Sequence, residues 1–353
     1  MKHLLKSWLR KFYAYTLFYT GAHAIVNRMM PRRLTILCGH CVDAAHLNGD
    51  LPSDMRTSPH KLRRMLGWFS KRYQMCTLSE GFDSIRDGSE GPSLLALTMD
   101  DGYRDNAEVM PALLEETGAR ATVFLESRAL DERRLNWSHK YFWLLSKLGD
   151  REAGEALLAA ATNDELKAKL GTALENDSRA SYHVKRVLKY DTSPEVRDPA
   201  IDALFEAEGG DERALCERVY MDWTGAKDLL SAGVELGGHT VEHPVLATLN
   251  AEQQLSEVKR GREVVERGIG SSLRVFAYPF GRRWDYDDNS VEAVRKAGFE
   301  AAVTTHAGTN DANSDPFRLA RLTFDEDTSL PLLVTEACGG FDLARRFGLD
   351  LSQ

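Results

Sequence analysis

A short apolar run ends in two adjacent carboxylates in the segment LLALTMDDGYRDN, residues 94–106. Neighbouring side chains on a regular strand point to opposite faces, so adjacent acids serve one site only where the strand stops and the backbone turns. Gly102 permits such a turn after Asp100 and Asp101. We therefore expect both carboxylates to face one site at the end of a buried strand. The alternative is that they only begin a turn or cap the next helix.

Short apolar strands alternate with amphipathic helices along much of the chain. We predict strands over residues 32–42, 93–99, 119–125, 234–238, 275–281, 301–305 and 321–324. We predict helices over residues 58–73, 109–116, 251–267 and 291–297. This alternation indicates a parallel α/β fold, in which functional sites lie at the carboxyl ends of the strands.

One long segment interrupts the alternation. Residues 128–222 are charged and helix-forming and contain no convincing strand, so we interpret them as a helical insertion or lid. The aromatic segment at its start, residues 135–145, is expected to pack it against the core. The chain then divides into a basic N-terminal segment (1–33), an α/β body (34–335) and a terminal helix or tail (336–353).

Composition and charge exclude several classes of protein. The chain has 353 residues, of which 43% are hydrophobic, enough to bury a sizeable core. A formal net charge of −8 and the absence of nucleic-acid-binding motifs argue against a nucleic-acid partner. The five cysteines are too thinly spread for a disulfide framework. The spacing of Cys38 and Cys41 resembles a zinc or redox site, but no second pair follows. We expect reduced cysteines and a cytoplasmic protein.

The N-terminal segment is strongly basic. Residues 1–42 contain no Asp or Glu, and residues 12–26 are rich in Tyr and Phe. This apolar stretch is shorter than the about 20 residues that a membrane-spanning helix needs. We predict that residues 1–33 form an amphipathic helix on an anionic membrane surface, at the inner face of the membrane. The alternative is a helix that packs on the protein itself or on a partner.

A pair of histidines follows the predicted strand at residues 234–238. His239 and His243 are four residues apart, so one helical turn would place both imidazoles on one face. Two histidines and one carboxylate form a standard open zinc site, and the Asp100–Asp101 pair can supply the acid. The zincin pattern is absent, because Thr240 and not Glu follows the first histidine. The alternative is a pair of surface or core histidines.

These motifs resemble those of the polysaccharide deacetylases, a family of carbohydrate esterases that includes nodulation-factor and chitin deacetylases. TMDDG (98–102) is similar to the family's first motif, usually TFDDG, and HTVEHP (239–244) to its second, H-S/T-x-x-H-P. FAYPFG (276–281) is similar to the third. The resemblance implies a distorted (β/α) barrel of about seven strands rather than eight, with the helical insertion between the first and second motifs.

The resemblance also implies roles for individual residues. Asp100 would be the general base, and Asp101, His239 and His243 the metal ligands. The backbone N–H of Phe280 would stabilise the oxyanion, and Tyr278 of the same motif is a further candidate for substrate contact. Two imidazoles and a carboxylate suit Zn²⁺, and also Co²⁺, Ni²⁺ or Fe²⁺.

Two positions depart from the family pattern. Ala277 stands where the third motif commonly has an Arg that orients the base; Arg321 can replace it, and Arg274 is a second candidate. The late Leu-x-His motif, which supplies the general acid, is absent. His306 is the nearest substitute along the chain, and His40 at the end of the first strand is the rival. Either can instead be a structural histidine.

The resemblance therefore implies a metal-dependent hydrolase that removes an N-acetyl group from an amino sugar of a polysaccharide or lipid-linked saccharide. Asp100 would take a proton from the attacking water. A deformylase or an O-deacetylase would use the same site. A different class of protein, a degenerate carbohydrate-binding relative, would keep the fold and lose turnover.

Overall fold

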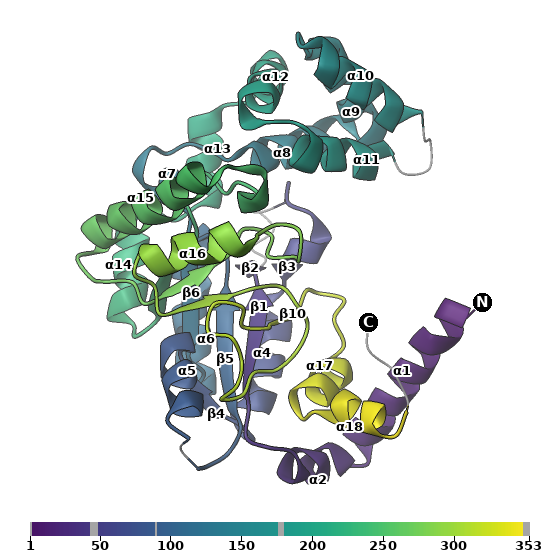
Figure 1. Ribbon diagram of the computed structural model, residues 1–353, viewed down its shortest axis with the longest axis vertical. Coiled ribbons are helices and arrows are strands. Elements are labelled where there is room, and N and C mark those ends of the chain that lie inside the picture. Colours follow the sequence, from purple (N-terminus) through teal and green to yellow (C-terminus); the bar gives the residue numbers. More distant parts are fainter. Residues whose placement is uncertain (1, 43–48, 89, 176–179, 349–353) are drawn as a thin grey trace.

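The computed structural model describes residues 2–42, 49–88, 90–175 and 180–348. A parallel sheet forms its centre (Figure 1). Seven strands follow the order β10-β1-β5-β6-β7-β8-β9, and β4 pairs with the first half of β5. Their bounds are β1 Leu34–Gly39, β4 Gln74–Cys76, β5 Leu94–Met99, β6 Ala121–Leu125, β7 Glu235–Gly238, β8 Val275–Ala277, β9 Ala301–Val303 and β10 Leu322–Thr323. A separate two-stranded sheet contains β2 (Cys41–Val42) and β3 (Arg56–Thr57).

The sheet curls until its two ends meet. β10 pairs with β1, and the residues just before β10 return to β9, because Leu319 bridges Val303. Six helices lie along the body of the barrel: α4 Pro59–Phe69, α5 Leu78–Arg86, α6 Arg104–Thr117, α14 Trp223–Ser231, α15 Ala251–Ile269 and α16 Asp288–Lys296. The predicted distorted (β/α) barrel is confirmed. β4 and α5 are elements that the sequence analysis missed.

Alternate strand residues point to the inside and the outside of the barrel. Leu34, Ile36, Leu94, Ala96, Phe124 and further apolar side chains form one buried cluster inside the sheet. Leu37, Leu95 and Leu97 belong to a second cluster together with Leu62 and Met110 of the outer helices. This period of two sets the direction of every polar residue at the strand ends.

The segment between β6 and α14 contains no strand among its described residues. Its elements are α7 Ser127–Asp131, α8 Trp137–Leu148, α9 Asp150–Ala160, α10 Asp164–Leu174, α11 Ala180–Arg186, the π-helical turn η3 Val187–Asp191, α12 Pro194–Ala207 and α13 Glu212–Val219. Trp137, Tyr141 and Leu144 help to form its own apolar core. In Figure 1 these helices, in teal, cover one end of the barrel. Residues 176–179 of the predicted insertion lie outside the described residues.

The chain ends pack together near the opposite end of the barrel (Figure 1). The four helices are α1 Lys2–Tyr19, α2 Ala22–Met29, α17 Leu330–Ala337 and α18 Gly340–Arg346. Arg10 pairs with Glu336 at 3.0 Å, and the Tyr13 hydroxyl donates to the Gly340 carbonyl at 2.9 Å. One face of α1 therefore packs on the protein itself, while Trp8 and Phe12 remain exposed. Residues 349–353 of the predicted tail lie outside the described residues. Among the described helices, none has the length and apolar character needed to cross a bilayer.

Gly237 offers a test of how closely β7 packs in the barrel. A Cβ at this position would lie 2.5 Å from the Phe124 ring and 2.9 Å from the Val275 carbonyl oxygen. We expect Gly237→Ala to lower the free energy of unfolding by about 1–3 kcal/mol, because the backbone oxygen cannot move away cheaply. Urea denaturation followed by circular dichroism measures the change.

Gly171→Ala is the matched control, because Gly171 lies in α10 and an added Cβ meets no atom within 4 Å. Replacing an unhindered helical glycine should raise stability by about 0.5–1 kcal/mol. A Gly237→Ala protein as stable as the wild type would contradict the described packing.

Candidate metal centre

Asp100 and Asp101 lie at the carboxyl end of β5, as expected. The side chain of Asp100 points into the barrel, as that of Thr98 does two residues earlier. The Asp100 backbone N–H donates to the Gly39 carbonyl at 3.0 Å. Asp101 then adopts a left-handed conformation, with φ of 73°, and Gly102 follows with φ of 78°. On a regular strand Asp101 would point outward. The left-handed turn instead brings its carboxylate to the same end of the barrel as Asp100.

His239 and His243 come from the loop that follows β7. The predicted helical turn is wrong, because Thr240 and His243 both have positive φ, 67° and 54°. A side-chain turn replaces it: the His243 backbone N–H donates to the Thr240 hydroxyl oxygen at 3.1 Å. A hydroxyl residue in this position can close a tight turn that a helix would not. The two imidazole rings still meet, with centroids 4.8 Å apart.

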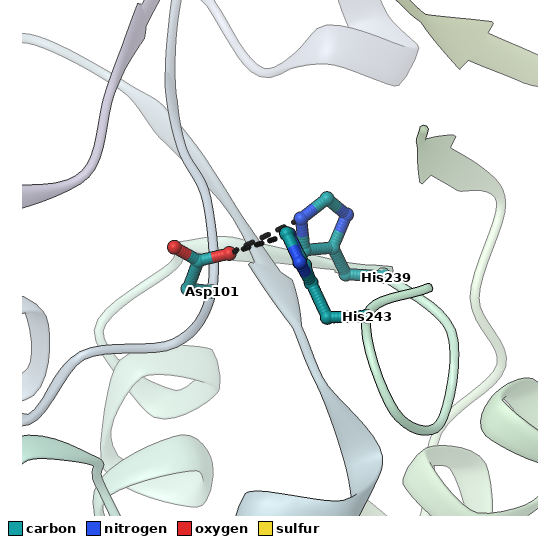
Figure 2. Close-up of side chains that lie close together, drawn as sticks. All are labelled: Asp101, His239 and His243. Carbon is teal, nitrogen blue, oxygen red and sulfur yellow. Dashed lines mark ion pairs between the residues drawn. The ribbon is translucent and has the colours of Figure 1, made fainter. Parts of the chain in front are cut away.

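The three predicted ligands converge in space. The Asp101 Oδ1 atom lies 3.2 Å from His239 Nε2 and 3.3 Å from His243 Nε2 (Figure 2). Their exposed fractions are 3%, 1% and 8%. Among the described residues, this is the one group of three or more His, Cys, Asp or Glu side chains that could hold a metal ion.

The hydrogen bonds around the cluster test whether a cation fits. His239 Nδ1 lies 2.7 Å from the Ala277 carbonyl oxygen. A carbonyl only accepts, so Nδ1 carries the hydrogen, and a neutral ring then presents its Nε2 lone pair to Asp101. Asp101 Oδ1 has no hydrogen-bond donor among the described residues. Two facing acceptors repel unless a proton or a cation lies between them. The donor set is also that of an open zinc site, so the residues fit a divalent metal.

Arg321, the residue directly before the last strand β10, holds Asp100. Its Nη1 lies 2.7 Å from Asp100 Oδ1, and its Nη2 donates to Asp100 Oδ2 at 2.8 Å. The same guanidinium donates through Nε to the Thr304 carbonyl at 2.7 Å, and Arg321 is fully buried. Arg274, the other candidate, instead pairs with Asp83 and Glu300.

Both carboxylates are held ionised. Burial by itself would raise the pKa of Asp100, but the guanidinium of Arg321 outweighs it, so the pKa lies below its usual value. Burial opposes ionisation of Asp101 as well. A positive charge on the imidazoles of His239 and His243 favours the ionised form, as a cation between these groups would, and the pKa of Asp101 lies well below its usual range. The site therefore presents two anions in a dry interior.

Phe280 and Tyr278 lie in different surroundings. Phe280 has a φ of 61°, and its ring packs edge-on against His243, with centroids 4.6 Å apart. Its backbone N–H donates no hydrogen bond within the described part of the chain. The Tyr278 ring is buried on Tyr286, and its hydroxyl donates to the Phe317 carbonyl at 3.0 Å. The Tyr278 side chain therefore points into the core, where the Phe317 carbonyl lies. It does not point towards Asp101, His239 and His243.

The two histidines that are candidates for the general acid, His40 and His306, lie in different places. His40 follows β1 directly, and the register of β1 and β5 pairs Gly39 with Met99, so His40 lies next to Asp100 along the rim. Its Nδ1 is buried with no hydrogen-bond partner among the described residues. The His306 ring lies against Tyr286, with centroids 5.8 Å apart. No hydrogen bond joins the His306 ring to the metal cluster in the described ranges.

A buried polar network behind Asp101 was not predicted from the sequence. The Tyr103 hydroxyl donates to Asp101 Oδ2 at 2.9 Å and lies 2.7 Å from His139 Nε2. Tyr220 and Glu126 extend the network. Asn136 could have been recognised as the N-cap of α8, where it accepts from the Ser138 and His139 backbone N–H groups. No sequence pattern indicates that this helix start meets the end of β5.

Comparison with known proteins agrees with the motifs. Residues 186–302 match the family model described as polysaccharide deacetylase. This match includes the histidine pair and the third motif and leaves out the aspartate pair. A Bacillus subtilis protein named "putative polysaccharide deacetylase YxkH" is 26% identical over 96 residues. The aligned part is 27% of this chain and 33% of that protein. The predicted resemblance to polysaccharide deacetylases is confirmed.

Solved structures share the fold over most of the chain. The Streptococcus pyogenes deacetylase PplD, in complex with acetate, has a TM-score of 0.57 at 15% identity, covering 87% of this chain and 99% of its own. IcaB from Ammonifex degensii has a TM-score of 0.55 at 16% identity, covering 88% and 98%. At this identity the likeness establishes the architecture of the barrel.

Glu126 provides a pH-dependent test of the network. Burial raises the pKa of Glu126 to about 8, whereas an unfolded glutamate titrates near ~4.3. Between these values the folded protein holds a proton that the unfolded chain releases, so stability falls as pH rises, by about 1 kcal/mol per pH unit. Glu126→Gln stays neutral, and we expect its unfolding free energy to fall less between pH 5 and pH 8.

Urea denaturation at several pH values in the presence of EDTA measures the two curves. Glu206→Gln, at an exposed position on α12, is the control. Parallel curves for the wild type and Glu126→Gln would show that Glu126 is ionised in the folded protein.

Proposed function

We propose that the protein is a metal-dependent hydrolase that removes an N-acetyl group from an amino sugar of a saccharide. The observation that carries the proposal is the buried Asp101, His239 and His243 cluster beside a second carboxylate, Asp100, that Arg321 holds ionised. A cluster of core histidines would have no need of a donor-free carboxylate oxygen between two imidazoles. The match of residues 186–302 to the polysaccharide deacetylase model supports the same reaction.

Asp101, His239 and His243 would hold the metal. When bound, such a metal polarises a carbonyl and brings the pKa of a coordinated water towards neutrality. Asp100 is the general base that takes the proton of the attacking water. The bidentate contact with Arg321 fixes the plane of this carboxylate and keeps it ionised before the reaction begins.

Two further groups complete the reaction. The unused backbone N–H of Phe280, beside His243, donates to the oxyanion that forms from the amide carbonyl. The departing amine needs a proton. Of the two histidines, we assign this role to His40, because it neighbours Asp100 across the β1–β5 pair and its Nδ1 has no described partner. His306 lies against Tyr286.

The relatives support a saccharide as the substrate. The family description and the name of the Bacillus subtilis relative both refer to polysaccharides, and one structural neighbour was solved with acetate. An N-acetylated saccharide therefore fits best. Zn²⁺ suits the donor set, and Co²⁺, Ni²⁺ or Fe²⁺ can use the same ligands.

The two aspartates have different roles, and variants separate them. Asp100→Asn should keep about one metal per chain and lower kcat by about 100-fold or more, because it removes the base and leaves the ligands. Asp101→Ala should lose metal and activity together. Elemental analysis and acetate release from N-acetylated oligosaccharides measure the two properties.

Glu242→Gln is the control, because Glu242 lies between the two histidines in the chain and is exposed, paired with Arg128 at 3.2 Å. This variant should keep both metal and activity. Normal turnover by Asp100→Asn would remove Asp100 as the base. Bound metal without acetate release from any acylated saccharide would favour a degenerate binding protein.

We also propose that the exposed face of α1 and α2 contacts an anionic membrane surface from the cytoplasmic side. This face presents Trp8, Leu9, Phe12, Tyr15, Tyr19, Ile25 and Met29, with exposed fractions between 41% and 75%. Lys11 and Arg28 are exposed on the same helices, and residues 1–42 contain no Asp or Glu. Aromatic side chains with basic neighbours favour the lipid headgroup region. The contact would hold the protein at the surface that carries a lipid-linked saccharide.

Vesicle binding tests this surface. The double variant Trp8→Ser and Phe12→Ser should bind vesicles of anionic phospholipid about tenfold more weakly or worse, because two exposed rings no longer enter the headgroup layer. Sedimentation with the vesicles measures the bound fraction. Tyr182→Ser, at an exposed position on α11 in the insertion, is the control. Equal binding by the wild type and the double variant would exclude this face.

A further inference from the structure

The helical insertion contacts the metal cluster through a chain of buried hydrogen bonds. Asp101 Oδ2 accepts from the Tyr103 hydroxyl at 2.9 Å, and the Tyr103 oxygen lies 2.7 Å from His139 Nε2. The Tyr220 hydroxyl lies beside both nitrogens of this ring, 3.0 Å from Nδ1 and 3.4 Å from Nε2, and His139 Nδ1 also lies 3.1 Å from Asn136 Oδ1. Tyr103 and Tyr220 are almost fully buried, and His139 is 4% exposed. Asp101 thus has one oxygen facing the two imidazoles, and its other oxygen accepts a hydrogen bond from the Tyr103 hydroxyl.

The donor of each of these hydrogen bonds can be assigned from the strengths of the possible acceptors. The Tyr103 hydroxyl has a single proton, and a carboxylate is a stronger acceptor than a neutral imidazole. We therefore assign that proton to Asp101. The Tyr103 oxygen then accepts from the Nε2–H of His139. This leaves the Nδ1 lone pair for the Tyr220 hydroxyl, while Asn136 Oδ1, 3.1 Å from Nδ1, accepts from the backbone N–H groups of Ser138 and His139. Every hydrogen bond from Tyr220 to Asp101 in this assignment points towards Asp101.

His139 is fixed by the start of its own helix. Asn136 caps α8, where its Oδ1 accepts from the backbone N–H of His139 at 3.2 Å. The Asn136 Nδ2 group donates to Glu126 Oε2 at 2.8 Å, and Glu126 directly follows β6. The first turn of α8 is therefore anchored on the barrel, so His139 cannot shift without breaking buried hydrogen bonds.

We propose that Tyr103 and His139 are positioning residues that fix the orientation of the Asp101 carboxylate, so that the insertion is part of the metal centre. The proposal rests on the proposed function, in which Asp101 is a metal ligand. A free carboxylate can rotate about its terminal torsion. With Oδ2 bound to Tyr103, Oδ1 stays directed at the point where His239 Nε2 and His243 Nε2 converge. Groups that orient a ligand in this way strengthen metal binding.

Metal affinity of single variants tests the proposal. Tyr103→Phe removes the donor to Asp101 with little change of shape, and His139→Leu removes the donor to Tyr103. Both should weaken binding of Co²⁺ and of Zn²⁺ by about 10- to 100-fold. His139→Gln keeps an N–H donor on a side chain of similar length and should restore most of the affinity. Titration calorimetry gives the dissociation constants, and the visible spectrum of bound Co²⁺ reports the ligand geometry.

Tyr141→Phe is the matched control. Tyr141 lies in α8, two residues after His139, and is fully buried, but its hydroxyl has no partner among the described residues. This variant should bind metal as the wild type does. Urea denaturation in the presence of EDTA shows whether each variant is folded, because a general loss of structure would lower stability in metal-free conditions.

The outcomes separate this proposal from the proposed function. Wild-type affinity and an unchanged Co²⁺ spectrum in folded Tyr103→Phe and His139→Leu would overturn the positioning role, whatever the activity. Weakened binding in these variants, with no acetate released by the wild type, would support the positioning role and overturn the hydrolase. A wild type that binds neither metal would overturn both.

Discussion

A carboxylate oxygen that faces two imidazole nitrogens in a dry interior is stable only with positive charge between them. Asp101 Oδ1 is held in this position by several unusual local conformations. Of the five non-glycine residues with positive φ in the described ranges, four lie at this site: Asp101, Thr240, His243 and Phe280. Each such conformation costs on the order of 1 kcal/mol or more. The strongly packed barrel offsets this cost, and the strain is concentrated where ligands must converge.

The second carboxylate of the site, Asp100, faces the interior because side chains alternate between the two faces of a strand. Thr98 and Asp100 both belong to the inward set of β5, so Asp100 needs no special backbone conformation to face the interior. A carboxylate alone in such surroundings would be protonated, as burial raises its pKa. Arg321 prevents this with two parallel hydrogen bonds, and two of its three other N–H groups donate to Thr98 and to the Thr304 carbonyl. The pair is neutral overall, and each of its charged nitrogen and oxygen atoms has a hydrogen bond, which makes its burial tolerable.

Local patterns predicted the elements that carry the site. The apolar run before Asp100 and the glycine after Asp101 indicated a strand end, and this was correct. The spacing of His239 and His243 suggested a helical turn. A turn closed by the Thr240 hydroxyl brings the two imidazole rings together equally well. The spacing alone therefore cannot distinguish a helical turn from this side-chain turn. The contact of Tyr103 with His139 could not be predicted, because it depends on where a separate helical segment docks.

The guanidinium of Arg321 comes from the residue directly before the last strand of the barrel, 221 residues after the carboxylate that it holds. During synthesis, Asp100 leaves the ribosome long before its partner exists. Until β10 has joined β1, Asp100 is an ordinary hydrated acid with no fixed direction. The closing strand therefore serves also as a check on completeness: a chain that stops before residue 321 lacks the group that orients Asp100.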